Sequence, residues 1–207
     1  MGRAQAGTPQ GVTTAHADDV YDEVSGTSHI AIVDRSGNAV SLTTTIESFF
    51  GARIMASGFL LNNQLTDFSF VPEQDGQPVA NRVQPGKRPR SSMAPTLVFD
   101  ASGKLHMVVG SPGGSLIIGY VVKALVATLD WKLDIQAAID LPNMTSRNDA
   151  TEIEAGTDAQ TLEAALVAMG HTVRRIDMTS GIHGIVRSGE GWTGGADPRR
   201  EGVAKGR

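Results

Sequence analysis

The sequence predicts an α+β fold from two β-hairpin patterns and one strongly apolar helix. Residues rich in β-favouring side chains flank short turns at 29–46 and again at 96–110. The helix is predicted over 116–129, directly after a glycine-rich turn. Further strands are expected late in the chain, at 172–176, 184–187 and 192–195.

The composition is typical of a globular protein and excludes several classes of partner. Of 207 residues, 40% are apolar and 19% are charged. A net charge of -4 with scattered basic residues gives no reason to expect binding to nucleic acid or to an anionic membrane. The absence of cysteine excludes disulfides and thiolate metal sites. The longest apolar run, 116–129, is too short to span a bilayer.

The first hairpin follows a polar and acidic segment. Residues 1–26 show no periodicity and are predicted to be flexible. From His29 an apolar run reaches Val33, a turn follows, and a second β-rich run extends over 39–46. The widely spaced histidines do not form a zinc motif.

Thr27 lies where the polar segment meets this hairpin, and the hairpin pattern brings Thr45 to the same end. A threonine released at its amino end by cleavage after Gly26 would have a hydroxyl nucleophile and its own amine as the base. The local sequence is also typical of an ordinary turn before a strand, because Gly and Ser favour turns and Thr favours strands.

A polar cluster occupies residues 62–64 and Asp67, between apolar neighbours. Polar side chains held close to apolar ones need partners, which a ligand or the backbone of an Asx-type turn can provide. Residues 69–90 are rich in Pro, Gly and charge and predict a long surface loop, of the kind that often forms a lid or a binding loop.

The glycine-rich turn Ser111-Pro112-Gly113-Gly114-Ser115 separates a predicted strand from the apolar helix. Backbone N–H groups at such a junction suit a phosphate or a developing oxyanion. A Walker-type phosphate loop needs a lysine at the end of the loop, and Lys123 lies more than two turns into the helix. An oxyanion hole is therefore favoured, and close packing of strand against helix is the alternative explanation for the glycines.

The second half of the chain predicts three shorter elements. A short helix is expected over 134–140, closed by Leu141-Pro142, and a brief strand at 152–154. Thr157 or Asp158 is expected to cap another helix, which ends at Gly170.

Five stretches, taken together and in order, resemble the small subunit of the γ-glutamyltransferase (γ-glutamyl transpeptidase) family of N-terminal nucleophile hydrolases. They are GTSHIAIVDRSGNAVSLTTTIESFFG (26–51), GFLLNNQLTDFS (58–69), PGKRPRSSMAPT (85–96), GSPGGS (110–115) and ADPRR (196–200). The resemblance spans nearly all of 27–207, which it identifies as a small catalytic subunit, with 1–26 as the tail of a large subunit or propeptide.

The resemblance implies a role for each residue that matches a family motif. Thr27 corresponds to the threonine that becomes the N-terminus by autocatalytic cleavage of Gly26–Thr27 and then attacks the γ-carbonyl, and Thr45 to the residue that assists it. Gly113 and Gly114 correspond to the oxyanion hole. The substrate-binding matches are Glu47, Gln64 and Asp67 for the α-amino group, and Ser91 and Ser92 for the α-carboxylate. Anionic acceptors suit an ammonium and hydroxyl donors suit a carboxylate.

The resemblance also implies part of an αββα four-layer sandwich whose large-subunit half is missing. Glu47 stands where many relatives carry Asn. Without its partner layer, the chain is expected to expose apolar surface on sheet edges and helix faces. Alone it is expected to be inactive, and poorly soluble or unstable. Its partner would be the large subunit of the same precursor.

The activity implied is hydrolysis or transfer of the γ-glutamyl group of glutathione and related compounds to water, an amino acid or a peptide, with no metal or organic cofactor. Members of the family are typically periplasmic or extracellular. Two alternatives remain: a β-lactam acylase of the same superfamily that removes a glutaryl-type side chain, and a non-catalytic, truncated fragment. Glutaryl lacks the ammonium that Glu47, Gln64 and Asp67 would bind.

Overall fold

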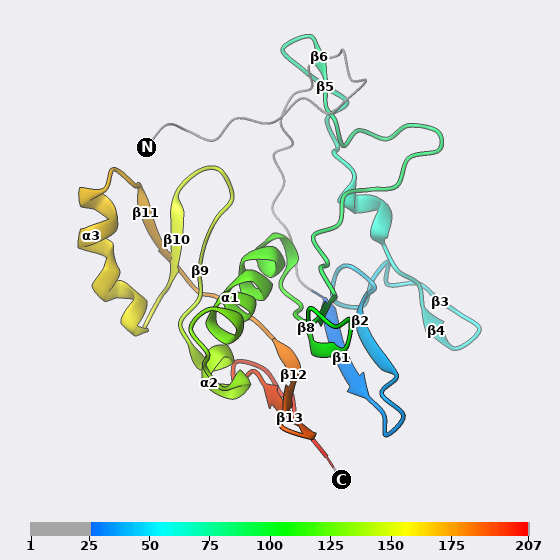
Figure 1. Ribbon diagram of the computed structural model, residues 1–207. Helices are drawn as coiled ribbons and strands as arrows, with labels where there is room; N and C mark the ends of the chain where they lie inside the picture. Colours follow the sequence, from blue (N-terminus) through cyan, green and yellow to red (C-terminus); the bar gives the residue numbers. More distant parts are fainter. Residues whose placement is uncertain (1–25, 207) are drawn as a thin grey trace. The chain divides into compact units, whose positions relative to one another are not determined.

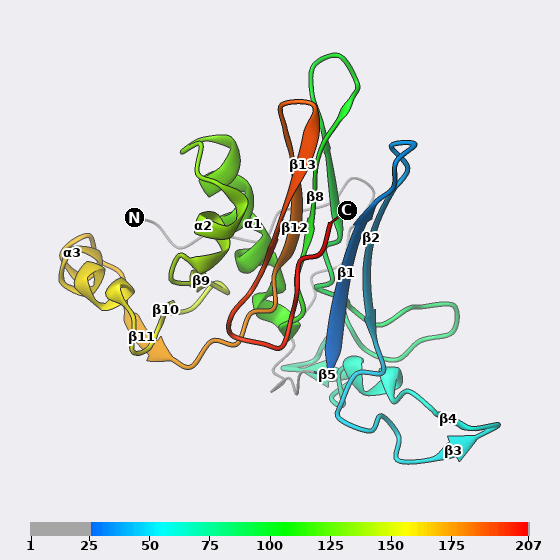
Figure 2. The ribbon, with the colours of Figure 1, turned by 90° about the horizontal axis from the view of Figure 1, so that it is seen from below.

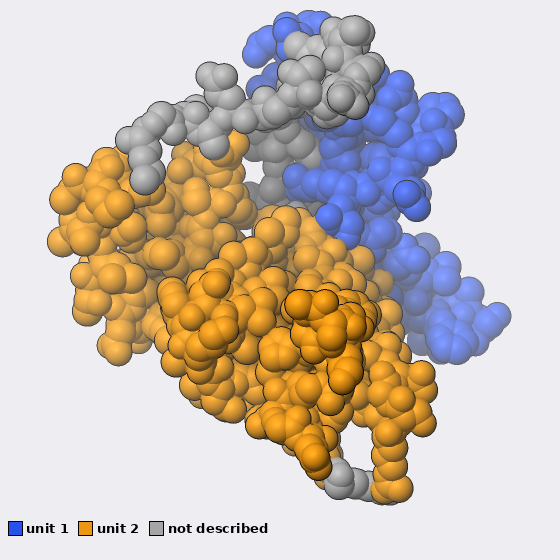
Figure 3. Space-filling model, viewed as in Figure 1, with its two compact units in different colours: residues 1–26, 46–91 blue, residues 27–45, 92–207 orange. Residues whose placement is uncertain are grey.

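The computed structural model describes residues 26–206, so the segment 1–26 that is predicted to be flexible lies outside the described residues except for Gly26. The described chain divides into two compact units (Figure 3). One contains Gly26 and 46–91, and the other contains 27–45 and 92–206. In the text that follows they are called the binding unit and the strand unit, respectively, and each is described by itself.

The predicted first hairpin is confirmed and belongs to the strand unit. Strands β1 (Thr27–Val33) and β2 (Ala39–Thr45) pair antiparallel. The turn between them is closed by Asp34, whose Oδ1 accepts hydrogen bonds from the backbone N–H groups of Ser36 and Asn38, both at 2.8 Å. A short acidic side chain that bonds to the backbone two residues on is a common way to fix such a turn.

A four-stranded antiparallel sheet forms the centre of the strand unit, in the order β13-β12-β8-β7. Three of its strands, β8, β12 and β13, are labelled in Figure 1. The second predicted hairpin supplies β7 (Thr96–Phe99) and β8 (Leu105–Gly110), and the late strands supply β12 (His183–Ser188) and β13 (Gly191–Ala196). Strand β8 is buried over its whole length except at the half-buried His106, which explains why its other residues are apolar or glycine.

The hairpin and the helices pack on opposite faces of this sheet (Figure 2). On one face, Ser41 Oγ donates a hydrogen bond to the backbone carbonyl of Val109 at 3.1 Å. On the other face lie α1 (Ile117–Leu129) and α2 (Ile135–Asp140), with Asp134 as the N-cap of α2. The sequence-predicted α+β class is confirmed, and the order sheet, sheet, helices corresponds to three layers of an αββα sandwich.

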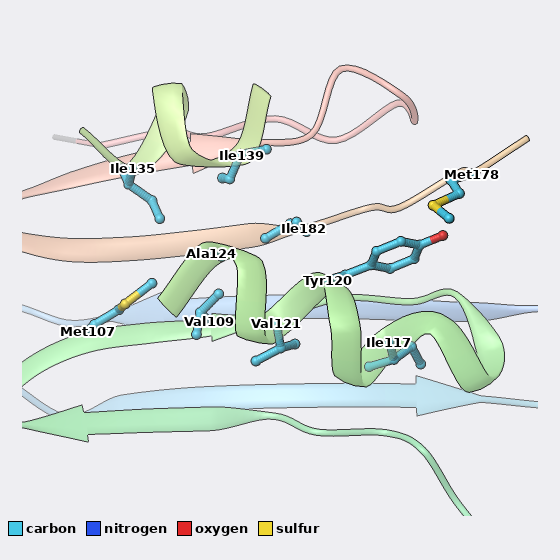
Figure 4. Close-up of a cluster of buried hydrophobic side chains, with 10 residues drawn as sticks. All are labelled: Met107, Val109, Ile117, Tyr120, Val121, Ala124, Ile135, Ile139, Met178 and Ile182. Atoms are coloured by element: carbon cyan, nitrogen blue, oxygen red, sulfur yellow. The ribbon is translucent and has the colours of Figure 1, made fainter. Parts of the chain in front are cut away.

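The main hydrophobic core lies between the central sheet and the two helices (Figure 4). Its buried members come from β8, α1, α2 and the segment before β12: Met107, Val109, Ile117, Tyr120, Val121, Ala124, Ile135, Ile139, Met178 and Ile182. Gly184 and Gly195, which face each other across β12 and β13, leave room for α2: a Cβ there would lie 2.7 Å from Ile135 Cδ1 and 2.9 Å from Ile139 Cδ1, respectively.

A smaller three-stranded sheet extends the strand unit, in the order β11-β10-β9. It consists of β9 (Met144–Ser146), β10 (Thr151–Glu154) and β11 (Val173–Ile176). The single helix predicted after Thr157 is instead a 3-10 helix, η3 (Asp158–Leu162), followed by α3 (Glu163–Ala168), although Thr157 is the cap as expected.

The binding unit contains only short elements. They are β3 (Met55–Ala56), β4 (Phe59–Leu60), η1 (Gln64–Asp67), β5 (Glu73–Gln74) and β6 (Gln77–Pro78). The predicted long loop over 69–90 includes the small β5–β6 hairpin. Phe68 and Val79 are the buried apolar side chains of this unit, so its interior is small.

The outward face of the β1–β2 hairpin is apolar. Ile30 lies opposite Leu42 and Ile32 lies opposite Val40, and these four side chains are 44% to 50% exposed. Exposed apolar surface is expected on sheet edges and helix faces. Here it lies on a sheet face, and the expectation for helix faces is confirmed on α1 (Ile117–Leu129), where Ile118 and Val122 are 55% and 50% exposed. Among the described helices, none has the length and hydropathy needed to cross a membrane.

Candidate active site

Thr27 and Thr45 are the terminal pair of the β1–β2 ladder. They lie directly opposite each other, Thr27 as the first residue of β1 and Thr45 as the last of β2. Opposite residues of antiparallel strands have Cβ atoms about 4.5–5.5 Å apart on the same face of the sheet. The structure therefore brings together the predicted nucleophile and the residue predicted to assist it.

His29 fixes β1 on the central sheet two residues beyond Thr27. Its ring is buried against Gly110, where a Cβ would overlap the ring, and its Nδ1 is 2.8 Å from Thr43 Oγ1. Burial lowers the pKa of His29 to about 4, and the neighbouring His183 adds to the shift. His29 is therefore neutral at pH 7.

The nucleophile end of β1 and the glycine-rich turn lie at the same end of the strand unit. His29 contacts Gly110, the last residue of β8, and Ser41 bonds to Val109, the residue before it. Because Ser41 pairs with Ala31, β1 passes Gly110 with its Thr27 end pointing beyond the end of β8. The turn 111–114 begins there.

Gly113 and Gly114 have backbone conformations that favour glycine, with φ of 136° and 57°. Gly114 begins the 3-10 helix η2 (Gly114–Leu116), which leads into α1. Their carbonyls accept hydrogen bonds from the N–H groups of Leu116 and Ile117, as in the first turn of a helix. The N–H groups of a first turn have no acceptor within the helix and are a common anion-binding site.

In the binding unit, two of the predicted binding side chains contact each other directly. Gln64 Nε2 donates a hydrogen bond to Asp67 Oδ2, which holds one Asp67 oxygen and orients the carboxylate. Asn81 Nδ2 donates to the backbone carbonyl of Asp67 at 2.7 Å, and Asn81 Oδ1 accepts from the N–H of Arg90 at 3.0 Å. Asn81 thereby connects the Asp67 segment to the residue before Ser91.

Glu47 is attached to the same cluster through the backbone on both sides of it. Asn63 N–H donates to Ile46 O at 3.2 Å, and Asn63 Oδ1 accepts from Ser48 N–H at 3.1 Å. Glu47 is buried and has a φ of 75°, a strained conformation for a residue with a side chain. Gly26 packs tightly against this segment, because a Cβ there would lie 2.6 Å from Glu47 O.

The predicted site residues are distributed over both units. Glu47, Gln64, Asp67 and Ser91 belong to the binding unit, and Thr27, Thr45, Ser92, Gly113 and Gly114 belong to the strand unit. Sequence reasoning missed Asn81, because an amide that joins two loops leaves no periodic pattern. Within 26–206, no group of three or more His, Asp or Glu side chains is arranged to hold a metal ion.

A sequence model of the family described as "Gamma-glutamyltranspeptidase" matches residues 3–207. The chain is 39% identical to a glutathione hydrolase proenzyme of Bacillus subtilis over 192 residues, which covers 89% of this chain and 32% of that protein. The chain thus spans about a third of the length of that relative.

Solved structures of two related enzymes match most of this chain. The gamma-glutamyltranspeptidase of Helicobacter pylori, as its T380A mutant, matches with a TM-score of 0.73 and 34% identity, covering 83% of this chain and 99% of that one. A cephalosporin acylase of Bacillus halodurans matches with a TM-score of 0.72 and 25% identity, covering 86% of this chain and 34% of that one.

Proposed function

Because this chain belongs to the gamma-glutamyltranspeptidase family, we propose that it is the catalytic small subunit of a γ-glutamyl hydrolase/transferase. The observation that carries the proposal is the register of β1 with β2, which sets Thr27 opposite Thr45 at the end of the hairpin. The relative from Bacillus subtilis is named as a proenzyme, which supports a cleavage step.

Cleavage of the Gly26–Thr27 bond frees the α-amine of Thr27, which the catalytic cycle uses as a base. Thr27 Oγ1 attacks the Gly26 carbonyl, the C–N bond breaks to leave an ester and a free amine, and water then hydrolyses the ester. The new α-amine has the position of a general base for the hydroxyl of the same residue. Thr45 accepts or donates a hydrogen bond at Thr27 Oγ1 and keeps that hydroxyl directed at the carbonyl.

The catalytic cycle then uses the same hydroxyl on a γ-glutamyl amide. The Thr27 amine takes the hydroxyl proton as Oγ1 bonds to the γ-carbonyl carbon, and the N–H groups of Gly113 and Gly114 stabilise the oxyanion. The C–N bond breaks, the amine leaves with the proton, and a γ-glutamyl ester remains on Thr27. Water or an amine acceptor attacks this ester and regenerates the hydroxyl.

Substrate recognition follows from the chemistry of the binding residues. Glu47 and Asp67 provide carboxylates for the α-ammonium group, and Gln64 adds an amide that orients Asp67. Ser91 and Ser92 provide hydroxyl donors for the α-carboxylate. We propose glutathione and related γ-glutamyl compounds as substrates, in line with the names of the relatives.

The partner we propose is the large subunit of the same precursor. The chain covers about a third of the relative from Bacillus subtilis, and the exposed apolar face of the β1–β2 hairpin is of the kind that a further layer covers. A fourth layer on this face would complete an αββα sandwich.

The alternative, a β-lactam acylase, is supported by the similarity to the cephalosporin acylase of Bacillus halodurans. A glutaryl side chain has no ammonium group, so the carboxylates of Glu47 and Asp67 would have no cation to bind in such a substrate. A γ-glutamyl anilide and its glutaryl counterpart, which lacks only the α-amino group, distinguish the two activities directly. We expect at least about a 100-fold preference for the γ-glutamyl compound, since a missing charged contact costs several kcal/mol.

The first test is the intact mass of the chain, expressed as the full precursor. We expect a product that begins at Thr27, and Thr27→Ala should remain uncleaved and lose at least about 10³-fold in activity, as nucleophile removal does in comparable enzymes. Ser28→Ala is the matched control, because Ser28 points to the opposite face of β1 and should be cleaved normally. A precursor that stays whole in the wild type would contradict the proposal and favour a non-catalytic fragment.

A further inference from the structure

The turn that contains Gly113 and Gly114 is held from behind by a serine that the mechanism above does not use. Ser111 is fully buried, and its hydroxyl donates a hydrogen bond to the carbonyl of Pro112 at 2.7 Å. A buried hydroxyl normally pairs with the most favourable acceptor nearby, and here that acceptor is a carbonyl within the turn itself.

The Ser111–Pro112 bond sets the direction of a proposed oxyanion donor. The Pro112 carbonyl and the Gly113 N–H belong to one peptide group, which is planar and trans, so the two bonds point in opposite directions. A hydroxyl that holds the carbonyl on one side therefore directs the Gly113 N–H to the other side. Gly113 has no side chain to limit its backbone dihedral angles, so the hydrogen bond from Ser111 is what fixes the orientation of this peptide group.

Ser111 is in turn held by the segment before β12. The N–H of Gly181 donates to Ser111 Oγ at 3.2 Å, which leaves the hydroxyl proton for Pro112. Gly181 also packs on the ring of Pro112: a Cβ at Gly181 would lie 2.7 Å from Pro112 Cγ. Gly181 thus contacts the turn both through its amide and through its α-carbon.

Asp197, directly after β13, fixes the residues on both sides of Gly181. Its Oδ2 accepts hydrogen bonds from Ser180 Oγ at 2.6 Å and from Ile182 N–H at 3.2 Å, and its side chain is fully buried. Its Oδ1 accepts from the N–H and the guanidinium of Arg199. A buried carboxylate with this many donors has one orientation, so the Gly181 segment has one position.

We propose that Ser111 is a positioning residue that sets the direction of the Gly113 N–H toward the oxyanion, and that Asp197, through Ser180 and Ile182, holds Gly181 against it. This inference rests on the proposed function. It assigns part of the ADPRR motif to catalysis through the Gly113 turn, in addition to its contribution to stability.

The test compares transition-state and ground-state binding in the full precursor and its matured enzyme. For Ser111→Ala we expect a decrease in kcat of about 10- to 100-fold, less than the loss of an oxyanion donor itself, with KM within about twofold. A glutamate analogue with a boronic acid in place of the γ-carboxyl group forms a tetrahedral anionic adduct with a hydroxyl. Its Ki should rise by the same factor, while the Ki of glutamate stays unchanged.

Thr128→Val is the matched control, since it removes another buried hydroxyl, one without a partner in the described structure, and should leave kcat and both Ki values unchanged. If Ser111→Ala does not mature, Ser180→Ala gives the same comparison one contact further back. A kcat equal to that of the wild type, or a parallel loss of glutamate and boronate binding, would overturn the inference. A wild type with no Thr27-dependent γ-glutamyl activity would contradict the proposed function, and the inference, which rests on that function, would then be wrong as well.

Discussion

Position 113 favours glycine for two reasons, its backbone conformation and the aromatic ring that lies next to it. Its φ is 136°, and a Cβ would lie 2.5 Å from Cε2 of Tyr120, a fully buried core residue. Each of these restrictions costs about 1–3 kcal/mol when an alanine is forced into it. We expect Gly113→Ala to lower Tm by several degrees and kcat by at least about tenfold, measured by calorimetry and with a γ-glutamyl anilide.

The control for this substitution is Gly37→Ala in the β1–β2 turn. Gly37 also has a positive φ, 82°, but no atom lies within 4 Å of the position of its Cβ. Gly37→Ala should lower the free energy of unfolding by about 1 kcal/mol, the cost of a positive φ for alanine, and should not change kcat. Equal effects of the two substitutions would contradict the role of Tyr120.

His29 should make the stability of the chain depend on pH below neutrality. Its pKa is about 4 when folded and about 6.5 when unfolded, so as pH falls from 6.5 to 4 the unfolded state takes up the proton first. Stability is therefore lost across this window, by on the order of 3 kcal/mol at about 1.4 kcal/mol per pKa unit. Above pH 6.5 the histidine is neutral in both states and contributes no slope.

Urea unfolding of the wild type and of His29→Gln between pH 4 and 7.5 measures this effect. His29→Gln removes this titration and leaves every other ionisable group in place. Only the wild type loses the His29 contribution as pH falls, so the difference in unfolding free energy between the two proteins should shrink. A constant difference across the window would show that His29 titrates normally in the folded chain.

At the scale of elements, the outward face of the β1–β2 hairpin is the clearest sign of a missing layer. We expect the double variant Ile32→Lys and Val40→Glu to make the isolated chain more soluble, because these opposite residues then form an ion pair in place of an exposed apolar pair. In the precursor the same variant should lower the yield of matured, assembled enzyme, because the two charges would be buried at the interface. Sedimentation and the fraction cleaved measure both outcomes.

The control for this pair is on a charged, solvent-facing turn. Ser36→Lys, near the tip of the hairpin, adds a charge away from the apolar face and keeps the backbone N–H that bonds to Asp34, so it should change neither solubility nor maturation by much. Normal maturation of the double variant would mean that the face is not covered in the assembled enzyme.

The elements themselves were largely predictable, because their signals are local. The turn at Asp34, the cap at Asp134 and the apolar run of α1 each lie within a few residues of what they determine. The division after Thr157 into a 3-10 helix and a short α-helix was not predicted, since both have nearly the same apolar spacing. For the site, the residue types at Thr27 and Gly113 suggested a catalytic role. The residues that position the Gly113 turn, Ser111 and Asp197, could not be recognised from their residue types.

At the scale of the whole strand unit, the contacts that join distant segments could not be predicted from periodicity. Ser111 and Gly181 are 70 residues apart, and Glu154 and Arg199 are 45 apart. Such pairs depend on the three-dimensional arrangement of strands, and buried polar groups show no spacing that distinguishes them from exposed ones in the sequence. Only the resemblance to a family drew attention to ADPRR, and it did not indicate what the motif contacts.

Arg199 connects three parts of the strand unit, and its replacement should show how much that connection contributes. Its guanidinium binds both carboxylate oxygens of Glu154 in β10, at 2.6 and 2.9 Å, as well as Asp197 and the carbonyls of Ile139 and Leu141 near the end of α2. Lysine keeps the charge but has no planar fork, so most of these bonds are lost around two buried carboxylates. We expect Arg199→Lys to cost about 3 kcal/mol or more, measured as a loss of unfolding free energy.

Arg174→Lys provides the comparison that separates this network from an ordinary ion pair. Arg174 lies 3.1 Å from the exposed Asp149 and 3.8 Å from the buried Glu152, but its own side chain is more than half exposed, so water and salt weaken both pairs. This substitution should cost less than about 0.5 kcal/mol. Because Arg199 also bonds to Asp197, Arg199→Lys should lower kcat together with stability, whereas Arg174→Lys should change neither. A stable Arg199→Lys with reduced kcat would mean that the network acts mainly on the Gly113 turn, and equal, small effects of both substitutions would show that burial of the Arg199 network adds nothing.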